Sequence, residues 1–101
     1  MKHRAIASVV IASSGHLFVA PELEGDEDYE YIYREANGLR WDRTSRSLHA
    51  HEPERWEHVE LLLHIASALR SAFDEDIHLT EKTVWQGVPM KLQSRMRSTL
   101  S

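Results

Sequence analysis

Residues 53–73, PERWEHVELLLHIASALRSAF, form the stretch that decides the fold of this chain. The stretch is rich in Leu, Ala, Glu and Arg, and it contains no Gly or Pro after Pro53. Pro53 suits a first helical turn, because the N–H that it lacks would have no partner there. At about 100° per residue, most of the large apolar side chains fall on one broad arc. The sequence therefore predicts one long helix that supplies much of the core.

The apolar arc of this helix is wider than a single sheet face normally covers. Its extra strip consists of Leu61, Ile65, Ala68 and Ala72. Such a strip requires a second covering layer, which comes either from the same chain or from another subunit. We favour the second subunit, so we predict a homodimer with these four residues at its interface.

The composition is that of one ordinary globular domain spanning residues 1–101. It is 42% apolar and 28% charged, with a net charge of -4, which disfavours a general nucleic-acid-binding role. There is no Cys, so disulfides, thiolate metal sites and a cysteine nucleophile are excluded, and a cytoplasmic location is expected. No segment is long enough to span a membrane, and the apolar run after Arg4 is read as a buried strand.

The residues before the helix predict a mainly antiparallel sheet. Residues 5–13 are apolar on both faces, which is typical of a central strand. Ser14-Gly15 is a turn signal, so residues 16–21 are expected to return beside the first strand and to pair Val10 with Val19.

A second hairpin is predicted around Asn37-Gly38, because residues 29–35 alternate and this dipeptide is a strong turn signal. Residues 47–51 then form a short fifth strand. After the helix, residues 77–79 suggest an edge strand, and Pro89 suggests the start of a final, basic helix. The expected fold is α+β, with about five strands packed on one long helix and a short helical C-terminal tail.

Aromatic side chains give one candidate site. Tyr29, Tyr31 and Tyr33 would share one face of their predicted strand, with Trp41 on the neighbouring strand and Trp85 in the tail. Such a set either packs against another layer or subunit, or lines a pocket for a planar or cationic ligand between the tyrosines and the tail. We favour packing.

Histidines give a second candidate. His49 and His51 would point to one face of a strand and His58 lies nearby, which together suit zinc with an open position for water. The alternative is that all three are polar surface positions. We favour that alternative and predict no metal and no cofactor.

The acidic loop of residues 22–28, ELEGDED, is a third feature. It is either a solvated connector or a binding surface for a basic protein partner or a hard cation, although its spacing fits no calcium-binding loop of the EF-hand type. We favour the connector.

No nucleophile framed by glycines and no glycine-rich phosphate loop is present in the sequence. The predicted function is therefore a non-enzymatic protein-interaction module that self-associates as a homodimer. Two alternatives stay open: a small-molecule-binding domain or enzyme that uses the tyrosine pocket, and a histidine metal site.

Overall fold

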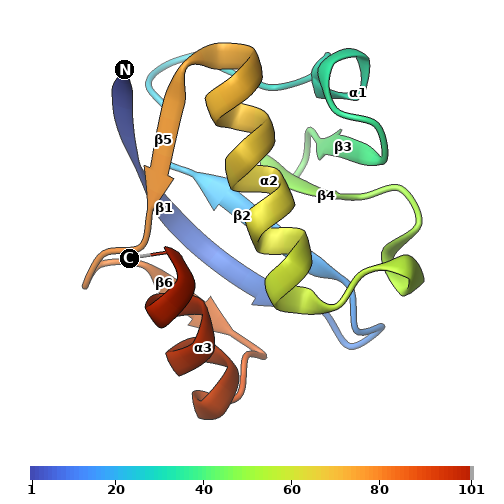
Figure 1. Ribbon diagram of the computed structural model, residues 1–101, viewed down its shortest axis with the longest axis vertical. Helices are drawn as coiled ribbons and strands as arrows, with labels where there is room; N and C mark the ends of the chain where they lie inside the picture. Colours follow the sequence, from blue (N-terminus) through green and yellow to red (C-terminus); the bar gives the residue numbers. More distant parts are fainter. Residues whose placement is uncertain (101) are drawn as a thin grey trace.

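The structure describes residues 1–100 and shows a mixed α+β fold with a six-stranded sheet. Figure 1 shows the computed structural model, in which α2 and α3 lie on the same side of the sheet. The elements in chain order are β1 (Lys2–Ile11), β2 (Leu17–Pro21), α1 (Ile32–Glu35), β3 (Leu39–Asp42), β4 (Ser47–Ala50), a 3-10 turn (Pro53–Arg55), α2 (His58–Phe73), β5 (Glu75–His78), β6 (Val84–Gln86) and α3 (Met90–Leu100). The prediction of an α+β fold is confirmed. Ser101, at the end of the predicted tail, lies outside the described residues.

The long strand β1 organises the sheet, whose strand order is β3-β4-β2-β1-β5. On one side β1 pairs antiparallel with β2. On the other side its first half pairs with β5 and its second half with β6, and both of these pairs are parallel. The sheet is therefore mixed rather than only antiparallel, because the helical crossover through α2 returns the chain to β1 in the same direction.

The first hairpin is present, but its register differs by one residue from the prediction. Val10 pairs with Phe18, and Val9 pairs with Val19. The turn explains the shift, because the Ala12 N–H bonds the His16 carbonyl at 2.9 Å and so closes a three-residue loop. Since side chains alternate along a strand, Val10 and Phe18 point away from the core while Val19 points into it.

The second predicted hairpin is wrong. Residues 29–35 form a turn followed by α1, and β3 pairs with β4 instead. The physical reason is that Tyr29 and Ile32 are both buried, and their spacing of three suits a helical turn rather than a strand. The Ile32 N–H bonds the Tyr29 carbonyl at 2.9 Å, which starts that turn.

The central helix is shorter at its start than predicted. It begins at His58, where the Glu57 carboxylate caps it by accepting the Val59 N–H at 3.4 Å. It ends at Asp74, which adopts a left-handed conformation with φ of 54°. This helix and α3 bury one continuous core between themselves and the sheet.

The wide apolar arc of α2 is covered by the chain itself. Leu61, Ile65 and Ala68 are only 1%, 0% and 8% exposed, and Ala72 is half-buried. The second layer is α3, which packs beside α2 and buries Met96 completely (Figure 1). Leu61, Ile65 and Ala68 are therefore not free to contact a second subunit, and the interface predicted on them is corrected.

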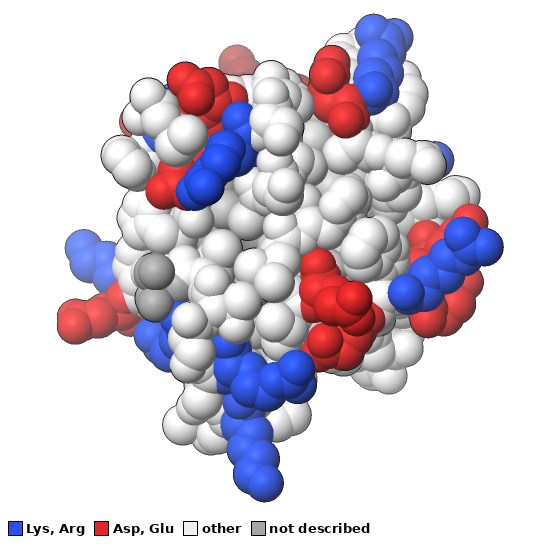
Figure 2. All heavy atoms as spheres, in the orientation of Figure 1, with Lys and Arg blue, Asp and Glu red and all other residues white. Residues whose placement is uncertain are grey.

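The outer surface of α2 is nevertheless poor in charge. Figure 2 shows charged side chains mostly around the margin of this side of the molecule and uncharged atoms across its middle. Leu63 and Phe73 are the large apolar residues of α2 that are exposed, at 38% and 41%. None of the helices in residues 1–100 is long and apolar enough to cross a membrane.

Candidate functional site

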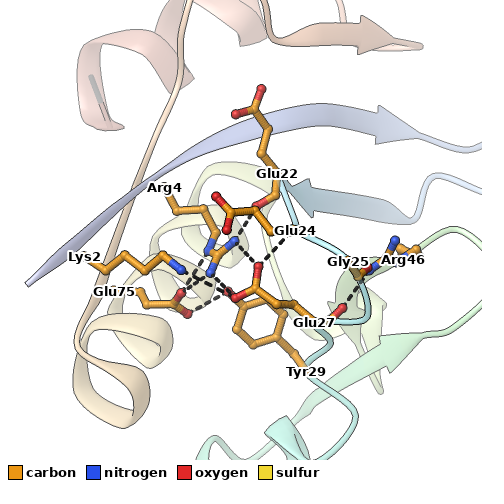
Figure 3. Close-up of polar contacts among 9 residues, drawn as sticks. All are labelled: Lys2, Arg4, Glu22, Glu24, Gly25, Glu27, Tyr29, Arg46 and Glu75. Atoms are coloured by element: carbon orange, nitrogen blue, oxygen red, sulfur yellow. Dashed lines mark hydrogen bonds and ion pairs between the residues drawn. The ribbon is translucent and has the colours of Figure 1, made fainter.

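A buried arginine lies where β1, the acidic loop and β5 meet (Figure 3). Arg4 is 5% exposed and points to the core side of β1. Its Nε donates to Glu75 Oε2 at 2.8 Å, and Nη2 lies 2.7 Å from the same oxygen. Nη1 and Nη2 donate to the two carboxylate oxygens of Glu27 at 3.1 and 2.9 Å, and Nη1 also donates to the Glu22 carbonyl at 2.5 Å. One guanidinium thereby ties together three separate segments.

The cluster continues through Glu75 to a buried tyrosine. The Tyr29 hydroxyl donates to Glu75 Oε1 at 2.6 Å, and both residues are buried. Burial, together with this hydrogen bond to a carboxylate, raises the pKa of Tyr29 well above its usual value. The hydrogen bond from Arg4, supported by the Glu24 backbone N–H, lowers the pKa of Glu27 to about 2.

The donors of Arg4 are all occupied, and this decides what the cluster can do. A guanidinium has five N–H donors, and each of its nitrogens already donates to Glu22, Glu27 or Glu75. Perturbed pKa values mark both active sites and structural ion-pair networks. Because no donor remains for a ligand, we assign Arg4 and its partners to holding the fold.

The sequence analysis missed Arg4 and Glu75 and assigned the acidic loop wholly to solvent. The structure shows a connector that is bound to its own chain through Glu27 and through Arg46, whose guanidinium donates to the Gly25 and Glu27 carbonyls. The available signal was the alternation of β1, which places Arg4 on the same face as the buried Ile6. Acidic side chains of the loop stay exposed, among them Glu22, Glu24, Asp26 and Asp28.

The predicted aromatic site is not formed. Tyr29 is buried, with its ring 5.5 Å from that of Trp41, whereas Tyr31 and Tyr33 are exposed around α1. Trp85 lies on β6, where the Arg97 guanidinium stands 5.3 Å from its ring. Figure 1 places α1 and α3 at opposite ends of the molecule, so the tyrosines and the tail do not enclose a pocket.

The three candidate histidines are used separately. His49 packs its ring 5.1 Å from Phe18, and His58 Nε2 bonds the Gly15 carbonyl at 2.8 Å. His51 is exposed. Within residues 1–100 no group of three His, Cys, Asp or Glu side chains is close enough to hold a metal ion. The zinc arrangement that we weighed as the less favoured alternative is therefore not assembled.

The sheet face opposite α2 and α3 is the most distinctive surface of the molecule, and we call it the open face. The register sets which side chains point outward there. On β1, β2 and β4 they include His3, Ala5, Ser8, Val10, Phe18, Ala20, Ser47 and His49. None of these is Lys, Arg, Asp or Glu, but the same register places Arg40 and Asp42 of the edge strand β3 on this face, opposite His49 and Ser47.

The open face has a half with larger side chains, the large half, and a half floored by alanines, the hollow half. The large half also has a hollow, of about 300 Å³, lined by Val10, Phe18 and Asp42 among others. Val10 and Phe18 lie side by side at one end. At the other end a hollow of about 620 Å³ is floored by Ala5, Ala7 and Ala20. The rim of this hollow carries charges of both signs, from Lys2, Arg46, Glu22 and Glu24.

The fold and these surfaces define a small two-layer α+β protein with a saturated buried ion cluster and one open sheet face, on which the residues of β1, β2 and β4 are uncharged. Residues 4–83 match the family model described as "Integron Cassette Protein Hfx_Cass5". The chain belongs to this family of integron cassette proteins.

A solved structure titled "Structure from the mobile metagenome of North West Arm Sewage Outfall: Integron Cassette Protein Hfx_Cass5" is 30% identical to the chain. The match covers 99% of this chain and 97% of that one, with a TM-score of 0.45. No curated protein matches the chain. The family name states no activity.

Proposed function

We propose that this protein is a non-enzymatic interaction module that self-associates as a homodimer through the open face of its sheet. The observation that carries the proposal is the division of that face into a large half and a hollow half. The hollow is floored by alanines, and the large half presents Phe18 and Val10 at the other end of the same strands.

Such a face is complementary to itself. A two-fold axis that lies between two facing sheets and runs across the strands would place the large half of each copy on the hollow half of the other. Phe18 of one copy would then enter the hollow above Ala5 and Ala20 of the second copy. This arrangement makes the same contact twice, as an isologous interface requires.

The size of the face sets the expected strength. Strands about 4.8 Å apart, with an outward residue roughly every 7 Å, give the face a projected area of roughly 400 Å². Two such faces would bury roughly 800 Å² in total, which is below the roughly 1,000 Å² of a stable specific interface. We therefore expect a weak dimer with a dissociation constant of roughly tens of micromolar. The outward residues of β1, β2 and β4 carry no Lys, Arg, Asp or Glu, so little desolvation of charge opposes contact there.

The outer surface of α2 is the competing candidate, because it is uncharged in its middle and exposes Leu63 (Figure 2). Within the described residues, one cavity near α2 is lined by Trp56 and Glu60 and another by Phe73. Neither is a hollow that matches a large side chain elsewhere on the outer surface of α2. The sheet face is therefore the better surface for a second copy.

Sedimentation velocity separates the two surfaces. We expect the wild-type chain to be mainly dimeric at about 100 μM and to dissociate on dilution. Phe18→Ser removes the large aromatic side chain and Ala5→Lys fills the hollow, so each should shift the chain to monomer while its circular dichroism stays folded.

Leu63→Ser on α2 is the matched control and should leave the dimer intact. The proposal is overturned if the wild-type chain stays monomeric at that concentration. It is also overturned if only the control variant dissociates the dimer.

A further inference from the structure

A crevice of about 390 Å³ lies where the edge strand β3, the segment before α2 and the first turns of α2 meet. Its lining includes Arg40, His51, Glu52, Arg55, Trp56 and Glu60. A volume of this size lies within the range of small-molecule sites. Neither Phe18 nor Ala5 lines it, although Arg40 stands opposite His49 of the open face.

The indole of Trp56 forms a fixed wall of the crevice. It is half-buried against the core, and the His64 ring stacks on it with centroids 4.6 Å apart and planes 16° from parallel. His64 Nε2 in turn lies 3.4 Å from the Asn37 carbonyl. An aromatic wall held in one orientation suits an apolar or planar ligand group.

The charges around this wall are of two kinds. Arg55 and Glu52 neutralise each other, with 3.0 Å between Arg55 Nε and Glu52 Oε2. Arg40 donates to its own strand, from Nη1 to the Leu39 carbonyl at 2.9 Å, and makes no ion pair with any residue of 1–100. Glu60 likewise has no ion pair in the described chain.

From this arrangement we infer that the crevice binds a small zwitterion with an apolar side chain, of the α-amino acid class. The ligand carboxylate pairs with Arg40, with His51 as a neighbouring hydrogen-bonding group. The ligand ammonium pairs with Glu60, and the side chain lies along the Trp56 indole. A ligand with one charge would pair with only one of Arg40 and Glu60, so both ligand charges contribute to the affinity.

The test follows the Trp56 indole N–H in two-dimensional ¹H–¹⁵N spectra during titration with L-phenylalanine. The resonance is assigned with Trp56→Phe. We expect a saturable shift, with 3-phenylpropionate, which lacks the ammonium, and phenethylamine, which lacks the carboxylate, each binding about tenfold more weakly.

Variants test the two charges separately. Arg40→Gln and Glu60→Gln should each weaken L-phenylalanine about tenfold. Arg43→Gln is the matched control and should change nothing, because Arg43 is exposed on the turn after β3 and pairs with Glu30.

The inference is overturned if L-phenylalanine causes no saturable shift up to about 20 mM. It is also overturned if the two singly charged analogues bind as well as the zwitterion, or if the control variant weakens binding as much as the other two.

Discussion

Replacing Glu75 by Gln tests the buried cluster that joins β1, the acidic loop and β5. The substitution keeps the shape of the side chain, and the amide oxygen can still accept from the Tyr29 hydroxyl. It removes one of the two carboxylates that face Arg4. Breaking a buried ion pair costs about 3–5 kcal/mol, because the remaining charge stays buried without its partner. Glu27 still pairs with Arg4, so we expect the lower end, about 3 kcal/mol.

Urea unfolding at neutral pH measures this loss directly, and the midpoint of thermal unfolding should fall by roughly 15 °C for a domain of this size. Glu24→Gln is the control. Its side chain is exposed on the same loop and makes no ion pair within residues 1–100, so its effect should stay within about 0.5 kcal/mol. A loss below about 1 kcal/mol for Glu75→Gln, with an unchanged denaturant slope, would refute the account of the cluster.

Three further predictions concern the backbone and the response to pH. Gly87 has φ of 70°, and a Cβ there would collide with the Ile11 carbonyl oxygen, so Gly87→Ala should lower the free energy of unfolding by about 3 kcal/mol; a change under about 1 kcal/mol in urea would contradict this. Glu27 stays ionised in the folded state down to about pH 2, so stability should fall as the pH drops from 4.5 toward 2, and Glu27→Gln should flatten that fall; an unchanged slope would contradict it. Tyr29 resists ionisation when folded, so stability should fall as the pH rises above about 10, and Tyr29→Phe should reduce this fall in alkaline urea titrations; equal falls in both chains would count against it.

Local periodicity predicted the elements that depend on nearby residues. The apolar arc of 53–73 predicted α2, and the apolar run of 5–13 predicted β1. Pro89 predicted the start of α3. In each case the side chains that decide the structure lie within a few turns or a few strand positions of one another.

Distant contacts were beyond the reach of those patterns. Arg4 and Glu75 are 71 residues apart, and nothing in their spacing shows that β5 lies parallel beside β1. The covering of α2 by α3 depends on the same kind of long-range packing, so the wide arc was assigned to a second subunit. Tyr29 and Ile32 fit both a strand and a helical turn locally, and only burial against the core selects the turn.

We propose that association depends on the open face, and a mixing experiment tests this proposal most directly. A chain carrying Phe18→Ser keeps the alanine hollow, and a chain carrying Ala5→Lys keeps Phe18. An equimolar mixture can therefore rebuild one of the two contacts of the dimer.

Sedimentation of the mixture beside each variant alone decides the matter. The account predicts more dimer in the mixture than in either separate sample at the same total concentration. A mixture that sediments as the simple average of its two components would contradict the claim that one copy's Phe18 enters the other copy's alanine hollow.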